Sequence, residues 1–156
     1  MKFNLLITFL AAFIPMLVGT VWYNPKVFGT AWMQANGFTK DDLDKSKMGL
    51  IFGLSFLFAV ILSVQLNTVV IHQFGVTQTL QQHPELLQQI LSEHANHFRS
   101  FGHGVLHGIV FSLFTVLPIL GTHALYEKKS FKYVAIHVGY WLVNFALMGG
   151  VICEFS

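Results

Sequence analysis

Residues Gly49 to Ile71 read GLIFGLSFLFAVILSVQLNTVVI, an apolar run without a single Lys, Arg, Asp or Glu. An α-helix rises about 1.5 Å per residue, so roughly 20 such residues cross the roughly 30 Å hydrocarbon core of a bilayer. Three further runs are similarly long and equally free of these charged residues: Phe3–Trp22, Phe101–Leu120 and Tyr133–Ile152. The sequence therefore predicts an all-α integral membrane bundle of four transmembrane helices.

The composition agrees with this prediction. Hydrophobic residues make up 54% of the chain and charged residues 10%, and the mean hydropathy is +0.60, whereas soluble domains contain about 25% charged residues. The nine Lys and Arg residues lie in separate loops, so they form no basic stripe for phosphates, and we expect a lipid bilayer and no nucleic acid as partner. The single cysteine, Cys153, excludes an internal disulfide. The length predicts one domain, residues 1–156.

Two shorter helices are expected outside the four spans. Within Val27–Asn36, Phe28 and Trp32 share one face at helical spacing, which predicts an interfacial helix after the first span. Pro84 is followed by leucine and isoleucine residues at amphipathic spacing as far as Leu91, which predicts an amphipathic helix before the third span. We expect this amphipathic helix to run unbroken into the third span.

Local signals refine the bounds of the spans. Pro15 predicts a kink inside the first span. Thr39 and Asp42 have the spacing of a capping box, which predicts one long helix from Lys40 to Ile71. The short connection His123–Lys132 predicts that the third and fourth spans form an antiparallel pair.

The loop charges predict how the chain is oriented in the membrane, because positive residues are retained on the cytoplasmic side. Four spans place both termini on one side, where only Lys2 and Arg99 are found. The opposite side holds seven basic residues: Lys26, Lys40, Lys45, Lys47, Lys128, Lys129 and Lys132. We therefore expect both termini on the outer side of the membrane.

The residues after the first span, Trp22 to Met33, read WYNPKVFGTAWM. The aromatic rings suit the depth of the lipid headgroups, and Pro25 ends the preceding helix. We interpret five residues as an interfacial aromatic clamp: Trp22, Tyr23, Pro25, Phe28 and Trp32. The segment resembles the signature of the domain of unknown function 1761 family, small four-span bacterial membrane proteins with a Trp-Tyr-x-Pro-x-x-Phe-Gly-x-x-Trp-Met run. The resemblance implies the architecture and transfers no catalytic residue.

Small residues four positions apart predict where helices pack closely in lipid. They occur in all three later spans, at Gly49 and Gly53, at Gly104, Gly108 and Ser112, and at Ala135, Gly139, Ala146 and Gly150. The spacing predicts close contacts within the chain. A homo-oligomer or a larger membrane complex is the alternative that it leaves open.

Histidine is the residue type that points to chemistry, since the chain holds eight. His103 and His107 lie one helical turn apart, and His72, His97 and the chain's C-terminal end are expected at the same membrane face. Together with Glu93, His94, Cys153 and Glu154, these residues form a donor set that suits Zn or Cu. The candidate metal ligands are His72, His97, His103 and His107.

Three interpretations follow for these histidines: hydrogen bonding between helices, a metal or haem site, and an oligomeric pathway for protons or small solutes. A haem would need His72 and His107 as its pair of ligands. No catalytic motif is present, so the sequence favours a non-enzymatic scaffold, accessory or small-ligand-binding membrane subunit. A metal protein binding Zn, Cu or haem, or a transporter, is the alternative.

Overall fold

The computed structural model describes all residues except 1–3, 40–41 and 43–46. The described residues form helices and turns and no strands, so the predicted all-α class is confirmed. The helices are α1 (Leu5–Ala11), α2 (Ile14–Trp22), α3 (Gly29–Asn36), α4 (Met48–Val70), α5 (His72–Thr79), α6 (Pro84–His94), α7 (Phe101–Phe111), the π-helical turn η2 (Ser112–Val116), α8 (Leu117–Tyr126) and α9 (Phe131–Phe155).

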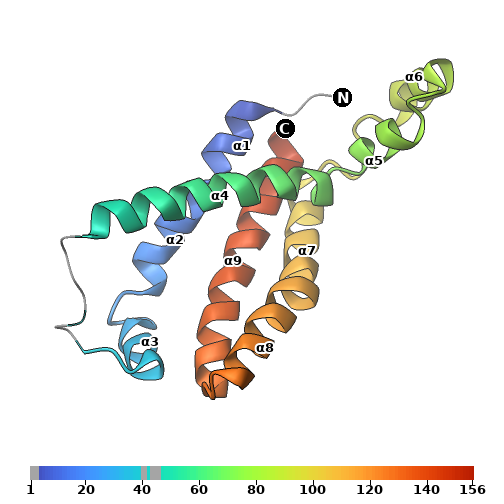
Figure 1. Ribbon diagram of the computed structural model, residues 1–156. Helices are drawn as coiled ribbons and strands as arrows, with labels where there is room; N and C mark the ends of the chain where they lie inside the picture. The colour runs from blue at the N-terminus through green and yellow to red at the C-terminus, as the bar shows by residue number, and fades with distance from the viewer. Residues whose placement is uncertain (1–3, 40–41, 43–46) are drawn as a thin grey trace.

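Four helical stretches are long and apolar enough to cross a membrane: Leu5–Trp22, Met48–Val70, Phe101–Tyr126 and Phe131–Phe155. The chain is therefore a multi-pass membrane protein, as the sequence predicts. Figure 1 shows α7, α8 and α9 running side by side, while α4 crosses in front of α9. Leucine, isoleucine and phenylalanine side chains on the outer faces of these helices are exposed, as expected for surfaces that face lipid.

The first and third spans are each interrupted near a proline. Pro15 is the second residue of α2, and the helix is interrupted just before it, between Ala11 and Ile14, where the sequence predicts a kink. In the third span, η2 ends two residues before Pro118. Proline has no backbone N–H to donate to the preceding turn, and a local change of helix type is one way to accommodate that loss.

The predicted long helix from Lys40 to Ile71 is described only from Met48 to Val70, since most of its first turns lie outside the described residues. The Asp42 Oδ2 atom accepts hydrogen bonds from Thr39 N at 2.7 Å and from Thr39 Oγ1 at 2.6 Å. These two bonds hold the pKa of the Asp42 carboxyl below its usual range. The local interaction expected of a capping box is therefore present.

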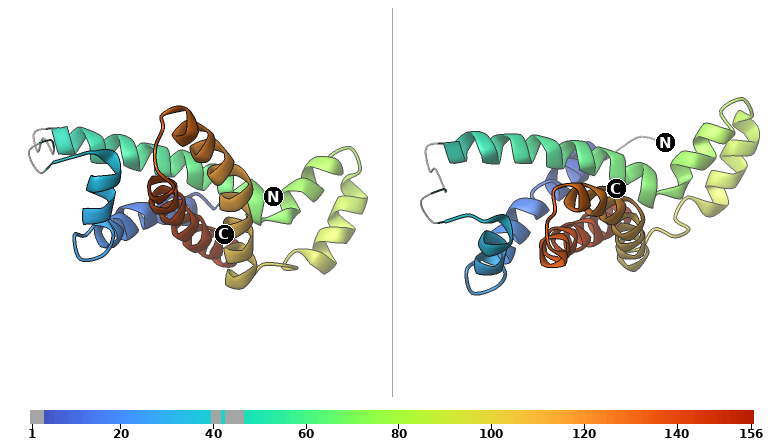
Figure 2. Two further views of the ribbon diagram at one scale, coloured as in Figure 1. Left: turned by 90° about the horizontal axis from the view of Figure 1, so that it is seen from below. Right: turned by 60° about the horizontal axis from the view of Figure 1, so that its bottom comes forward.

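The prediction of an unbroken helix from Pro84 into the third span is wrong. Helix α6 ends at His94 and α7 begins at Phe101, with Phe98 in the left-handed region at φ 60°. The Ser100 side chain accepts a hydrogen bond from His103 N and so caps α7. This cap and the turn before it start a new helix in a new direction. As a result, α5 and α6 form a hairpin that extends from one end of the bundle (Figure 2).

The predicted close contact of small residues is confirmed between α7 and α9. A Cβ atom at Gly104 would overlap the Gly149 carbonyl, and one at Gly108 would overlap the Phe145 carbonyl. These two glycines let the helix backbones touch, which is how helices gain dispersion energy in lipid. At Gly49 and Gly53, no atom of another described segment lies within 4 Å of such a Cβ position, so α4 uses neither glycine for a contact with the described residues.

Buried apolar residues of α4 and α9 pack together to form the hydrophobic core, among them Leu66, Val70, Met148 and Ile152. A buried polar contact joins α4 to α1, because Asn67 Nδ2 donates to Thr8 Oγ1 at 3.0 Å. The start of α1 and the end of α9 lie at the same end of the bundle (Figure 1), where Asn4 Nδ2 donates to the Phe155 carbonyl at 3.2 Å. The start of α7 and the hairpin of α5 and α6 lie at this end as well.

Candidate metal centre

Three histidines converge at the end of the bundle that carries the termini. His72 Nε2 lies 2.9 Å from His103 Nε2. The ring centroid of His107 lies 4.9 Å from that of His72 and 4.5 Å from that of His103. One ligand atom from each of the three residues falls within 4.8 Å of the others. We call His72, His103 and His107 the three-histidine cluster.

Local backbone features bring the cluster together. Ile71 is extended, at φ −109° and ψ 96°, which separates α4 from α5 and makes His72 the first residue of a new helix. His103 and His107 lie one turn apart in α7. Each is followed by a glycine that packs against α9. The imidazoles of His103 and His107 both contact the imidazole of His72.

The spacing of the nitrogen atoms suits a metal ion. A tetrahedral ion bound to imidazole at about 2.0–2.1 Å holds its ligand atoms roughly 3.3 Å apart, and the ligand atoms of the cluster lie within 4.8 Å of one another. The donors are imidazoles, which favour Zn²⁺, Cu²⁺ and their neighbours in the first transition row. His72 is exposed while His103 and His107 are half-buried, so an ion could reach the cluster from the polar side.

Cys153 and Glu154, which the sequence places at the same face, do not join the cluster. The buried Cys153 Sγ donates to the carbonyl oxygens of Val70 and Phe98. Glu154 Oε2 accepts a hydrogen bond from Phe101 N at 2.6 Å, where a carboxylate is favoured by the dipole of α7. Both side chains secure the start of α7 against the end of α9.

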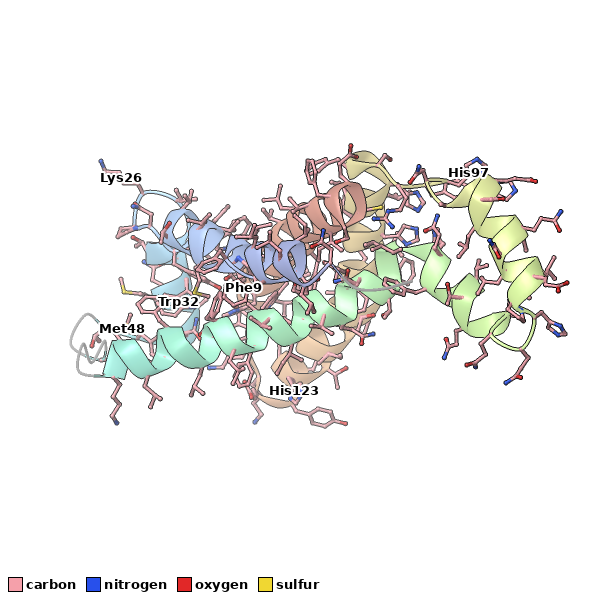
Figure 3. The ribbon with its side chains drawn as sticks, turned by 90° about the horizontal axis from the view of Figure 1, so that it is seen from above. Phe9, Lys26, Trp32, Met48, His97 and His123 are labelled. Carbon is pink, nitrogen blue, oxygen red and sulfur yellow. The ribbon has the colours of Figure 1, made fainter. Side chains whose placement is uncertain are left out.

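His97, the fourth candidate ligand, lies outside the cluster and next to His94, with ring centroids 4.6 Å apart. A pocket of about 230 Å³ separates these two residues from the cluster, and His72, His94 and His97 all line it. Figure 3 shows the labelled His97 where the α5–α6 hairpin meets the bundle, far from Trp32 and Lys26.

A haem does not fit between His72 and His107. Their ring centroids are 4.9 Å apart with an interplanar angle of 72°, so the two rings touch edge to face. Two axial histidines bind haem iron from opposite faces of the macrocycle, which must pass between the rings. The geometry therefore favours a bare ion over the haem alternative.

The predicted aromatic clamp lies at the other end of the bundle. The rings of Trp22 and Phe28 lie 4.4 Å apart and those of Tyr23 and Trp32 5.3 Å apart. Pro25 accepts a hydrogen bond at its carbonyl from Thr30 Oγ1. The ring of Tyr140 in α9 stands 5.2 Å from Tyr23, and burial, with nearby tyrosine hydroxyls, raises the pKa of Tyr23. The clamp thus includes a residue of the fourth span.

Two residues near the histidines, Phe98 and Gln73, are not predicted by the sequence analysis. Phe98 places its ring 5.2 Å from His103 and 5.9 Å from His72. Gln73 donates from Nε2 to the carbonyl oxygens of His94 and His97. The position of Gln73 beside His72 in the chain was a usable signal, whereas no local pattern predicts a phenylalanine in the left-handed region.

Comparison with known proteins gives one match by family. The family model described as "Protein of unknown function (DUF1761)" matches residues 6–153, nearly the whole chain. Neither the curated proteins nor the solved structures contain a match.

Proposed function

The chain belongs to the DUF1761 family, whose description names no activity, and from that premise we propose a function in metal binding. The protein is a multi-pass membrane protein that holds one first-row transition-metal ion through His72, His103 and His107. The ion is Zn²⁺ or Cu²⁺ by the chemistry of the donors.

The observation that carries this proposal is the convergence of three imidazoles from two helices. His72 and His103 are separated by 31 positions in the sequence, so their contact results from the tertiary fold. A hydrogen bond between these two rings pairs one nitrogen of each, and each ring has a second nitrogen. A metal ion gives all three residues a common partner. The hydrogen bond joins only His72 and His103 and gives no such partner to His107.

The surroundings of the cluster support exchange of the ion with the polar phase. Three ligands leave a fourth position of a tetrahedral ion for water or an incoming group, and His72 lines a pocket at this side. Among the described residues, the cluster contains no carboxylate or thiol. Binding and passing on an ion therefore accounts for the site without a catalytic step, in keeping with the non-enzymatic function that the sequence favours.

The proposal includes an orientation. The cluster lies at the end that holds both termini, and the loop charges favour the outer side for that end. In a bacterial inner membrane, the site would face the periplasm. A reporter fused to Ser156 that is active only outside the cytoplasm supports this orientation, and a cytoplasmic reporter reverses it.

The test of metal binding uses the full chain without a polyhistidine tag, purified in detergent, stripped with a chelator and then titrated with Zn²⁺. We expect one tightly bound ion per chain. The double variant His103→Gln/His107→Gln should keep its helical circular dichroism and lose the ion.

The matched control is His83→Gln/His123→Gln, in which two histidines outside the cluster are replaced. This variant should bind Zn²⁺ as the wild type does. A wild-type chain that takes up no zinc contradicts the proposal. Zinc retained by the His103→Gln/His107→Gln variant contradicts it as well.

A further inference from the structure

The hairpin of α5 and α6 carries a second group of possible metal ligands. The rings of His94 and His97 lie 4.6 Å apart, and Glu93 Oε2 lies 3.9 Å from His94 Nε2. All three residues are exposed. Two neighbouring imidazoles bind divalent first-row ions, and an exposed pair of this kind exchanges its ion readily with water.

Gln73 fixes this second group beside the three-histidine cluster. The residue follows His72 directly and is only 5% exposed. Its Nε2 donates to the His94 carbonyl at 3.2 Å and to the His97 carbonyl at 2.8 Å. The end of α6 is thereby held against the start of α5. The position of the two histidines relative to His72 is thus set by buried hydrogen bonds.

The space between the two groups has a largely apolar wall, in which a few polar side chains are set. The pocket of about 230 Å³ is lined by His72 from the cluster and by His94 and His97 from the hairpin. Gln73 also lines it, and its buried Oε1 has no hydrogen-bond partner among the described residues. A buried acceptor without a partner is costly, and a water molecule carried by an ion would satisfy it.

Phe98 stands between the two groups. Its ring centroid lies 5.2 Å from that of His103, 5.9 Å from that of His72 and 6.2 Å from that of His97. Phe98 is 65% exposed, so the described residues leave most of its surface uncovered. A rotation of this ring would change the width of the path between the hairpin histidines and the cluster.

We propose that His94 and His97 form a capture site, which takes up a divalent first-row transition-metal ion from the polar phase and passes it along the pocket that both residues share with His72 to the three-histidine cluster. This inference rests on the proposed function. The ion keeps its oxidation state, and each ligand it leaves is replaced by an imidazole of His72, His103 or His107. The half-buried cluster retains the ion longer than the exposed capture site does.

The test follows Co²⁺ binding to the full chain in detergent by stopped flow, because tetrahedral Co²⁺ with nitrogen ligands absorbs in the visible. The double variant His94→Gln/His97→Gln should fill the cluster roughly tenfold or more slowly than the wild type, as expected when local concentration of an ion is lost. Its final absorption spectrum and equilibrium affinity should equal those of the wild type. His83→Gln, at the far end of the same hairpin, should bind at the wild-type rate.

The outcomes separate this inference from the proposed function. Equal filling rates in the wild type and the His94→Gln/His97→Gln variant overturn the capture site while leaving the cluster intact. A wild-type chain without the tetrahedral spectrum overturns the proposed function itself. The variant Phe98→Ala should bind and release Co²⁺ faster, and unchanged rates remove Phe98 from the path.

Discussion

The two ends of the bundle are built from different kinds of side chain. At the end with the termini, the imidazoles of His72 and His103 approach to 2.9 Å. At the opposite end, the aromatic clamp packs ring against ring, and the Tyr140 hydroxyl donates to the Pro15 carbonyl at 2.9 Å. The first end gathers nitrogen lone pairs, and the second gathers apolar ring surface.

This difference separates a binding end from an anchoring end. Aromatic rings at headgroup depth gain from contact with each other and with lipid, so the clamp needs no further partner. The buried Trp22 Nε1 has no hydrogen-bond partner among the described residues, but an indole N–H only donates and cannot bind a cation. The histidine end, in contrast, offers several acceptors at one point, where the proposed ion would bind.

The largest effect is expected from a substitution that separates α7 from α9, the helix pair that connects the two ends. Gly108→Ala places a Cβ atom into the Phe145 carbonyl, so α7 must move away from α9, and we expect a loss of about 3 kcal/mol in the free energy of unfolding. Gly121→Ala is the matched control, because nothing lies within 4 Å of its Cβ position. Chemical unfolding in detergent micelles measures both. Equal stabilities would show that the glycine contact does not hold the bundle.

The next prediction compares the ends by their response to metal. An ion at 100 times its dissociation constant stabilises a folded protein by about 2.7 kcal/mol. We expect this gain with Zn²⁺ for the wild type and for Trp32→Ala, which alters the clamp alone, and no gain for His103→Gln/His107→Gln. Unfolding curves with and without Zn²⁺ give the three values. A loss of the gain in Trp32→Ala would mean that the two ends are not independent.

Acidification should weaken Zn²⁺ binding, because imidazole must be uncharged to act as a ligand and binding releases protons. An isolated histidine titrates at about pH 6.5, so the affinity for Zn²⁺ should fall steeply below that pH. Calorimetric titrations at a series of pH values measure the change. An affinity that does not vary between neutral and acidic pH would exclude histidine ligands.

A smaller effect is expected at the clamp. Tyr140→Phe removes the hydrogen bond to the Pro15 carbonyl, which should cost about 1 kcal/mol of stability and leave the Zn²⁺ affinity unchanged. Tyr126→Phe is the control, since that side chain is 87% exposed. If the two variants are equally stable, the hydroxyl of Tyr140 contributes nothing to the anchoring end.

The smallest effect concerns the turn at Thr39. The pKa of Asp42 is depressed by two hydrogen bonds from Thr39, so the stabilisation of this turn is present above the ordinary pKa of an aspartate and is lost as the pH falls through the lowered value. Carbon NMR of the Asp42 carboxyl should show a midpoint below the ordinary one. Thr39→Val should raise it, and Thr30→Val should leave it in place.

The sequence predicts the features that depend on local properties of the chain. The four apolar runs, the break at Pro15 and the helix start at Pro84 follow from hydrophobicity and from the missing N–H of proline, and the structure contains all three. The helical spacing of Gly104 and Gly108 likewise predicts the contact with α9, because close approach requires small residues on one face.

The features that depend on distant partners escape the sequence. Helix α7 begins at Phe101 because Ser100 caps it and Glu154, from the far end of the chain, accepts from the Phe101 N–H. The same packing leads Cys153 to donate to backbone carbonyls. Residue type and the shared membrane face place Cys153 and Glu154 among the possible ligands, and only the fold separates them from His72, His103 and His107.

The most direct test of the metal centre is an anomalous difference map, recorded at the zinc absorption edge from crystals of the full chain grown with Zn²⁺. We predict one peak that lies about 2.0–2.1 Å from a nitrogen atom of His72, His103 and His107. Crystals that contain zinc elsewhere and show no peak between these three imidazoles would contradict the account.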